Sequence, residues 1–136
     1  MTDCVPADNP GEKLDPAAIL VVEDEVLIRL MIAEELRAAG YVVLEAADTD
    51  EAMAVLQADA GIGLVFTDVR MPGVLDGLGL ARWVRARMPH LKVIVASADQ
   101  ASLRGPGSWD AGMTKPYDIP GVLRCVRRLL GASGEP

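Results

Sequence analysis

The sequence predicts a doubly wound α/β fold, in which a parallel sheet is covered by helices on both faces. Three apolar runs, rich in Val and Ile and without polar alternation, are typical of parallel strands buried on both faces: residues 19–22, 64–67 and 93–96. Helix-patterned segments with short connections alternate with these runs, as expected for such a sheet. Polar residues follow each run directly, so they would meet at the sheet edge formed by the strand carboxyl ends.

The first half of the chain alternates strand and helix patterns in short steps. Residues 25–39 carry apolar side chains at helical spacing, and Gly40 then provides a C-terminal cap. A short strand is expected over residues 42–44. Asp48, with Glu51 three positions later, has the spacing of a capping box and opens a second helix. The side chains expected to face the core from these helices are Ile28, Met31, Ile32, Leu36, Ala52, Val55 and Leu56.

The second half repeats the alternation. After a loop at Met71-Pro72-Gly73, a helix is expected from Leu75 or Asp76 to Arg87. Residues 91–96 follow as a strand, and Asp118 opens a last helix. The apolar faces of these two helices comprise Leu80, Ala81, Val84, Met88, Val122, Leu123, Val126, Leu129 and Leu130.

One interruption lies between Ser97 and Lys115. This segment contains Gly105-Pro106-Gly107, and Gly and Pro disfavour a helix interior by about 1 and about 3 kcal/mol each. We therefore expect a turn or two over residues 99–103, and a helix between the fourth and fifth strands that is short or absent.

Composition bounds the class of protein. The chain of 136 residues is long enough for one domain without disulfide or metal support, expected over residues 18–131 between flexible tails at 1–17 and 132–136. A net charge of −7 argues against wrapping nucleic acid. No apolar run reaches the ~20 residues of a membrane span. Cys4 and Cys125 make no disulfide framework, which fits a cytoplasmic protein.

Four motifs, in this order and spacing, resemble the receiver domain of bacterial two-component response regulators: ILVVEDE, LVFTDVRMPG with DGLGLA, VIVASA, and KPYD. The resemblance covers residues 18–130. It implies a flavodoxin-like fold, with five parallel strands in the order 2-1-3-4-5. It also implies a phosphoprotein of phosphorelay signalling. Such a domain is no classical enzyme, but catalyses its own phosphoryl transfer and can hydrolyse its own phosphoaspartate.

The resemblance assigns a metal and a phosphoryl acceptor to the predicted sheet edge. Asp68 would be the phosphoacceptor. Asp24 would bind Mg²⁺ directly and Glu23 through water, with the carboxylate of Asp68 beside them. The backbone carbonyl of Arg70 would complete the protein's share of the metal shell.

The same resemblance assigns the groups that contact the phosphoryl oxygens. Ser97 would donate a hydrogen bond to them, and Lys115 would pair with them. Pro116 would hold the bend after Lys115 through a cis peptide bond. The partner would be a sensor histidine kinase or a histidine phosphotransfer protein carrying phosphohistidine.

Elementary chemistry agrees with these roles. Carboxylates about 4 Å apart repel by about 4 kcal/mol at an effective dielectric of about 20, so three together need a cation. A small number of hard oxygen ligands suits Mg²⁺. Phosphoryl transfer depends mainly on positioning and charge stabilisation. The one histidine, His90, lies between Pro89 and Leu91 in a predicted loop, away from the strand ends.

Each residue also has a simpler explanation. Acids after a strand often only cap the next helix, which Glu23-Asp24-Glu25 could do. Ser97 could be a turn former and Lys115 a solvated surface lysine. The presence of Asp68 and Lys115 in one chain makes capping alone the weaker explanation. The remaining basic side chains are expected to form a solvated face, with partner docking as the alternative: Arg70, Arg82, Arg85 and Arg87.

The sequence departs from the receiver pattern in two places. Gly112 stands three positions before Lys115, where receivers commonly carry an aromatic side chain that moves when the hydroxyl residue engages the phosphoryl group. The loop over residues 71–77 is one residue longer than the common form. These departures predict an atypical receiver with intact phosphorylation chemistry and altered output, carried by residues 98–110.

The expected output is protein contact or onward phosphoryl transfer, because no effector domain follows Leu130 in this sequence. We expect a monomer or weak homodimer that binds neither nucleic acid nor membrane. Two other function classes remain open. A binding module with this fold would act without phosphorylation. A flavodoxin-like enzyme or nucleotide binder would need a Gly-rich loop where Glu23-Asp24-Glu25 stand, and their charge would repel phosphate.

Overall fold

The computed structural model describes residues 17–105 and 107–131. The tails predicted at residues 1–17 and 132–136 therefore lie outside the described part of the chain, apart from Ala17. Within the described ranges, none of the helices combines the length and the hydropathy of a membrane-spanning segment.

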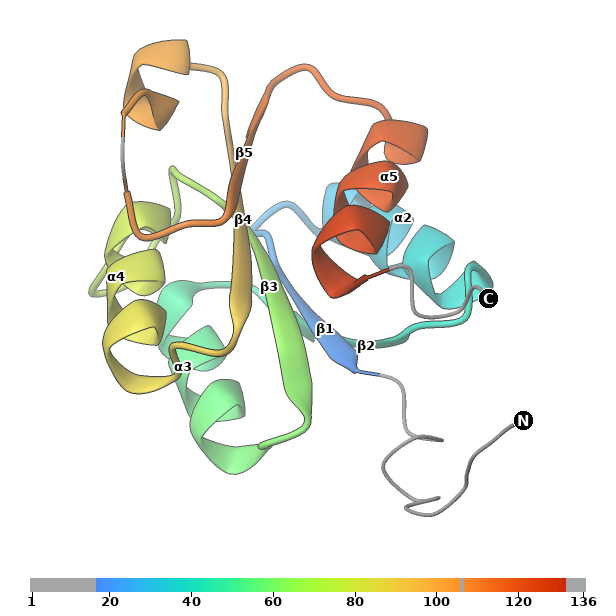
Figure 1. The fold of residues 1–136 in the computed structure, drawn as a ribbon, viewed down its shortest axis with the longest axis horizontal. Coiled ribbons are helices and arrows are strands. Elements are labelled where there is room, and N and C mark those ends of the chain that lie inside the picture. Colours follow the sequence, from blue (N-terminus) through green and yellow to red (C-terminus); the bar gives the residue numbers. More distant parts are fainter. Residues whose placement is uncertain (1–16, 106, 132–136) are drawn as a thin grey trace.

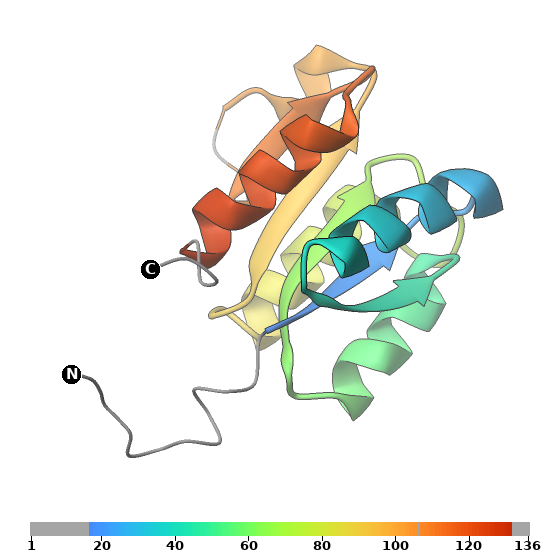
Figure 2. The same ribbon diagram turned by 90° about the vertical axis from the view of Figure 1, so that its right-hand side faces the viewer.

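The described residues form the five-stranded parallel sheet that the sequence predicts. The strands follow the order β2-β1-β3-β4-β5, and each neighbouring pair is parallel. The arrows in Figure 2 accordingly point the same way. This order confirms the flavodoxin-like arrangement. The strands are β1 (Ala18–Val22), β2 (Val42–Ala46), β3 (Ile62–Asp68), β4 (Lys92–Ser97) and β5 (Ala111–Thr114).

Two helices cover each face of the sheet (Figure 1). Helices α3 (Thr49–Ala58) and α4 (Gly77–Arg87) lie on one face, and α2 (Val26–Ala38) and α5 (Ile119–Leu130) lie on the other. The sheet is therefore doubly wound, as predicted.

Aspartate caps begin three of these helices. The side chain of Asp48 accepts a hydrogen bond from the backbone N–H of Glu51 at 2.7 Å. Asp76 and Asp118 accept equivalent bonds, at 2.8 Å each, from the third residue of α4 and of α5. Each carboxylate satisfies a backbone donor that the first helical turn leaves unpaired. The predicted starts of these helices are confirmed.

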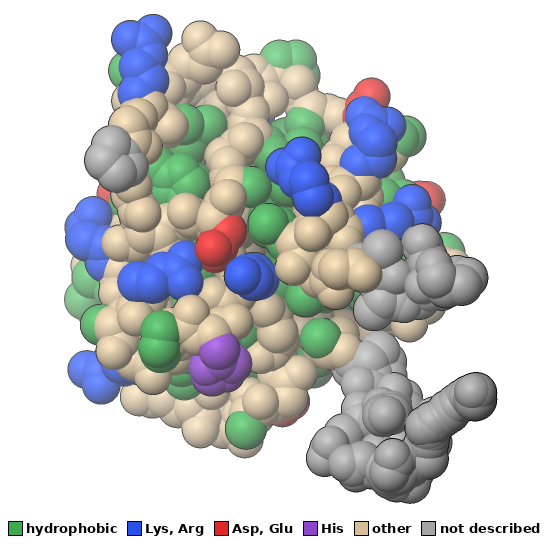
Figure 3. Space-filling view, viewed as in Figure 1, with side chains coloured by type: hydrophobic (Ala, Val, Ile, Leu, Met, Phe, Trp, Pro, Cys, Tyr) green, Lys and Arg blue, Asp and Glu red, His purple; other side chains and the backbone are tan. Residues whose placement is uncertain are grey.

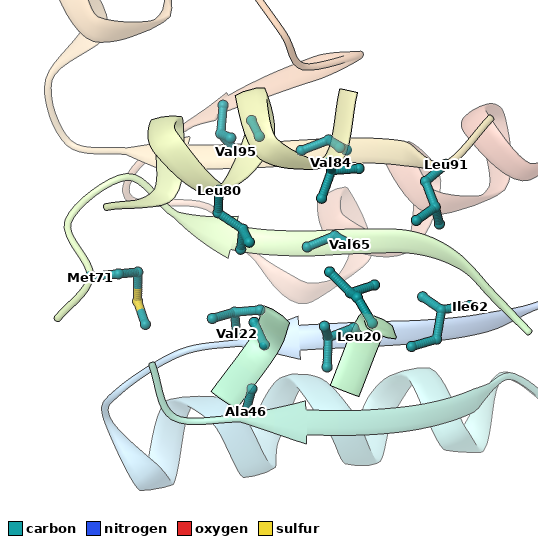
Figure 4. Packing of buried hydrophobic residues seen from close by; sticks show 14 of the residues in the cluster. Leu20, Val22, Ala46, Ile62, Val65, Met71, Leu80, Val84, Leu91 and Val95 are labelled. Carbon is teal, nitrogen blue, oxygen red and sulfur yellow. The ribbon is translucent and has the colours of Figure 1, made fainter. Parts of the chain in front are cut away.

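The three central strands, β1, β3 and β4, are buried on both faces, which explains why their sequences do not alternate. On β1, Leu20 and Val22 lie in the core beneath α3 and α4, whereas Ile19 and Val21 lie in the core beneath α2 and α5. Figure 4 shows the first of these cores at close range. The residues labelled there are Leu20, Val22, Ala46, Ile62, Val65, Met71, Leu80, Val84, Leu91 and Val95.

The core face of α2 is narrower than predicted. The expectation that Met31 faces the core is wrong, since its side chain is 51% exposed while Ile32 and Leu36 are each 1% exposed. Helix α2 packs on β1 and β2 at one side of the sheet and meets α5 on one flank only, so a single stripe is covered. On α5 the sequence analysis missed Cys125, which is buried beside Val122.

The connection between β4 and β5 forms one short 3₁₀ helix in its described residues, η2 (Gln100–Leu103), as the Gly and Pro content predicts. Leu103 and Trp109 pack against the core beneath α4. Arg85 of α4 holds the segment down, because its guanidinium donates to the carbonyl of Ser108 at 3.1 Å and pairs with Asp110 at 2.7 Å. On the face drawn in Figure 3, basic side chains are scattered over several elements rather than gathered into one patch.

Candidate functional site

The strand register brings the predicted site residues to one edge of the sheet. Val22, which precedes Glu23, pairs with Thr67, which precedes Asp68. On the other side of β3, Asp68 pairs with Ala96 at the end of β4. The end of β4 is in turn aligned with the end of β5, because Ser97 pairs with Thr114. The four strand ends therefore lie level with one another.

Three carboxylates meet at this edge. One oxygen from each of Glu23, Asp24 and Asp68 lies within 4.8 Å of the others. The side chains differ in exposure: Glu23 is 2% and Asp68 is 5% exposed, whereas Asp24 is exposed to solvent. Burial of like charges at this distance is unfavourable without a cation or a proton.

The two oxygens of Asp68 have different surroundings. Oδ2 accepts a hydrogen bond from the ammonium of Lys115 at 3.0 Å. Oδ1 is buried and has no hydrogen-bond partner among the described residues. A buried carboxylate oxygen without a donor is costly, and together with two further carboxylates it forms the hard oxygen set that Mg²⁺ prefers. The site therefore fits a magnesium ion held by Glu23, Asp24 and Asp68.

Glu23 responds to this environment most strongly. Burial, followed by the neighbouring negative carboxylate of Asp68, raises the pKa of Glu23 to about 8, against an ordinary 4.5. The backbone N–H of Glu25, which donates to Oε2 at 3.1 Å, and the charge of Lys115 oppose this shift. Without a cation, the pair thus holds a proton at neutral pH.

A cavity of about 400 Å³ opens beside Asp68. It is lined by Asp68, Arg70, Ala96, Ser97, Ala98, Asp99 and Lys115. The hydroxyl of Ser97 faces a local turn, because it accepts from the backbone N–H of Asp99 at 2.9 Å and lies 3.2 Å from that residue's carbonyl oxygen. The cavity is large enough for a phosphoryl group, and Ser97, Lys115 and Arg70 are among the residues around it.

Every side chain that the sequence analysis assigned to the site lines this edge. Lys115 is joined to the end of β4 by its backbone N–H, which donates to the carbonyl of Ser97 at 2.9 Å. The bond between Lys115 and Pro116 is cis, as the resemblance implies. His90, excluded from the site, lines a separate cavity with Leu56 and Met88.

The comparison with protein families decides the class of this fold. The model described as the response regulator receiver domain matches residues 19–116. The chain belongs to this family. The predicted site residues Glu23, Asp24, Asp68, Ser97 and Lys115 all lie inside the matched range.

Curated relatives of this receiver domain include regulators and kinases. It is 32% identical over 126 residues to the transcriptional regulatory protein FixJ of Azorhizobium caulinodans, covering 85% of the chain and 56% of FixJ. It is 34% identical over 119 residues to the sensor kinase CckA of Brucella abortus, covering 84% of the chain and 12% of that kinase. The receiver domain thus spans only part of the length of these relatives.

Solved structures agree with the fold. The response regulator protein TrrA of Thermotoga maritima, in complex with Mg²⁺-BeF, has a TM-score of 0.71 and 29% identity, covering 83% of this chain and 98% of that one. The receiver domain of the hybrid histidine kinase CckA also has a TM-score of 0.71, with 35% identity over 84% of this chain and 99% of that one.

The acidic pair is held in place by a residue that the sequence did not predict. Arg29 of α2 donates from Nη1 to the backbone carbonyl of Glu23 at 2.9 Å, and from Nε to the carboxylate of Glu45 on β2 at 3.1 Å. It therefore joins the end of β1 to the edge strand of the receiver domain. An arginine within a helical pattern usually lies in solvent, so the position of Arg29 in the sequence did not predict that it would join β1 to β2.

Gly112 shows how the receiver domain fills the place of the usual aromatic side chain. A Cβ at Gly112 would lie 3.3–3.4 Å from three side-chain atoms of Leu103. Leu103 of η2 therefore lies against this position on β5, although Gly112 itself is exposed. Tyr117 lies elsewhere, packed edge-on against Phe66 with ring centroids 5.9 Å apart. Burial and the charges of Asp68 and Glu23 raise the pKa of the Tyr117 phenol.

Proposed function

We propose that this receiver domain accepts a phosphoryl group on Asp68 from a phosphohistidine, with Mg²⁺ as cofactor. The donor is a sensor histidine kinase or a histidine phosphotransfer protein, and the output is protein contact or onward phosphoryl transfer. One observation carries the proposal: Asp68 has one oxygen paired with Lys115 and the other buried and unpartnered beside Glu23 and Asp24.

Each residue has a defined part in the transfer. The carboxylate of Asp68 attacks phosphorus, forming a bond to oxygen while the bond from phosphorus to the donor imidazole nitrogen breaks. The imidazole leaves with the electron pair, so no general base is needed on Asp68. Bound Mg²⁺ supplies positive charge that stabilises the phosphoryl oxygens. Lys115 supplies the second positive charge from the other side of the cavity.

Transfer to Asp68 also changes what Ser97 can bond to. In the unmodified domain its hydroxyl is engaged with the backbone of Asp99. Phosphoryl oxygens in the same cavity are stronger acceptors than a carbonyl. When Ser97 Oγ turns toward them, the N–H of Asp99 loses its partner. The carboxylate of Asp99 caps η2 by accepting from the N–H of Ala101 at 3.0 Å, so the change passes to residues 98–105 and 107–110.

A gain in intact mass tests the proposal. The protein is incubated with acetyl phosphate and Mg²⁺, and separately with EDTA. We expect a gain of one phosphoryl group with Mg²⁺ that disappears with EDTA and in Asp68→Asn. Asp59→Asn, which changes an exposed carboxylate near the end of α3, serves as the matched control and keeps the gain. Phosphorylation of Asp68→Asn at the wild-type level would contradict the assignment.

A second candidate function rests on Gly112. Because Leu103 occupies the space beside Gly112, the aromatic movement common in receivers has no counterpart at this position. A receiver-fold binding module would bind its partner equally well before and after phosphorylation. An unphosphorylated wild-type domain in the mass experiment, despite saturating Mg²⁺ and acetyl phosphate, would favour this alternative.

A further inference from the structure

The buried side chain of Thr49 fastens the loop that follows Asp68 to the start of α3. This residue is fully buried, with 0% of its surface exposed. Its hydroxyl donates to the carbonyl oxygen of Leu75 at 2.7 Å and accepts from the backbone N–H of Leu75 at 3.4 Å. Its own backbone N–H donates to the carbonyl of Pro72 at 3.3 Å. One threonine thus satisfies backbone groups at two points of the loop.

The same loop is also fixed at Gly73 and Gly77, where its backbone lies close to neighbouring atoms. Gly73 has φ +120°, and a Cβ there would collide with Thr49 Oγ1. Gly77 donates its N–H to the carbonyl of Val69 at 2.8 Å, and a Cβ there would collide with the carbonyl oxygen of Asp68. The loop is therefore held between the side chain of Thr49 and the backbone of Asp68.

Arg70 lies in this loop, between two residues that are held in place. Met71, directly after it, is 9% exposed and belongs to the core shown in Figure 4. Pro72, one residue further, accepts the bond from Thr49. On the other side, Val69 donates its N–H to the carbonyl of Ala96 at 2.9 Å. Because hydrogen bonds hold Val69 and Pro72 on either side of Arg70, the direction of the Arg70 carbonyl depends on the contact between the loop and Thr49.

We propose that Thr49 is a positioning residue for the magnesium site, acting through the loop on the Arg70 carbonyl. Thr49 contacts neither the carboxylates nor the phosphoryl group; it holds the loop whose backbone supplies a metal ligand. Groups outside the ligand set commonly tune metal affinity in this way. The inference rests on the proposed function, with the Arg70 carbonyl as the magnesium ligand that the resemblance to receiver domains implies.

Magnesium affinity tests the inference. Thr49→Val keeps the shape of the side chain and removes the hydroxyl. We expect it to weaken Mg²⁺ binding about 10-fold, the lower end of what loss of such a partner costs. Binding is measured by calorimetry and by NMR titration of the backbone amides of Val69 and Arg70. Thr49→Ser, which keeps the hydroxyl, restores the wild-type affinity.

A matched variant separates positioning from general destabilisation. Leu56→Ala opens a cavity at the opposite end of α3, in the same core. It should lower the melting temperature while leaving Mg²⁺ affinity unchanged. If Thr49→Val also lowers the melting temperature but leaves Mg²⁺ affinity at the wild-type value, Thr49 is structural only and the inference is wrong.

A milder variant covers the case in which Thr49→Val does not fold. Asp50 accepts a bond from the backbone N–H of Val74 at 3.4 Å and is exposed, so Asp50→Ala loosens the same loop without opening the core. We expect a smaller loss of Mg²⁺ affinity, and no loss would overturn the inference. A wild-type domain that binds no Mg²⁺ would instead overturn the proposed function.

Discussion

Two loops leave the sheet edge beside Asp68, and they are held in different ways. The loop between β3 and α4 is fastened by buried groups, namely Thr49, Met71 and Gly77. The connection between β4 and β5 contains η2, which has no buried residue, and is held by the partly buried Leu103 and Trp109 and by partly exposed groups on Asp99 and Arg85. Breaking a buried hydrogen bond costs more than breaking one that water can replace. The first loop is therefore suited to fixing the chemistry, and the second to moving.

Glycine substitution in each loop gives the largest expected contrast. Gly77→Ala places a methyl group against the carbonyl of Asp68, with no room to relax, and should reduce the free energy of unfolding by about 3 kcal/mol. Gly105→Ala meets no atom within 4 Å and carries only the cost of φ +75°, about 1 kcal/mol. Urea unfolding of the two variants measures the difference. Equal losses would mean that the two loops are equally constrained.

Arg85 tests how firmly the second connection is held. Arg85→Met removes the bonds to Ser108 and Asp110, and should reduce the free energy of unfolding by about 1–2 kcal/mol, because the pair is partly exposed. Hydrogen exchange in residues 107–110 should become faster. Arg82→Met, an exposed arginine on the same helix, is the control and should change neither quantity. An unchanged exchange rate in Arg85→Met would show that other contacts hold the segment.

The last prediction concerns the pH profile of stability, in which the two loops play no part. The pKa of Glu23 is about 8 in the folded domain and about 4.5 when unfolded, so between these values the folded state binds the extra proton. In EDTA, stability should therefore fall as pH rises from about 4.5 to about 8. Glu23→Gln should flatten this part of the profile, and Mg²⁺ should reverse the fall in the wild type. Thermal unfolding across the pH range measures it; identical profiles for both proteins would contradict the role of Glu23.

The sequence predicted much of the fold because its evidence is local and strong. The unbroken apolar runs such as Leu64-Val65-Phe66 mark strands buried on both faces, and Asp48, Asp76 and Asp118 mark helix starts. The convergence of Asp68 and Lys115 also follows from sequence, since parallel strands bring their carboxyl ends to one edge. The short η2 followed from the Gly and Pro content of its connection.

The supports of the site could not be predicted in the same way. Arg29 and Thr49 act through contacts with residues far along the chain, at Glu45 and Leu75, and neither has a distinctive neighbour in sequence. Threonine at the first position of a helix is usually solvated, so its complete burial comes from the loop folded over it. The prediction that Met31 faces the core was wrong, because its helical spacing fits the core face of α2. The width of that face depends on how α2 packs on the sheet, which the sequence does not show.

Hydrogen exchange with and without phosphorylation tests the division between the two loops most directly. The wild-type domain and Asp68→Asn are compared with acetyl phosphate and Mg²⁺ present. We predict that phosphorylation changes exchange in residues 98–105 and 107–110, that exchange in residues 69–76 stays the same in both states, and that Asp68→Asn shows no change. A domain that gains the phosphoryl group but changes exchange only in residues 69–76 would contradict the account.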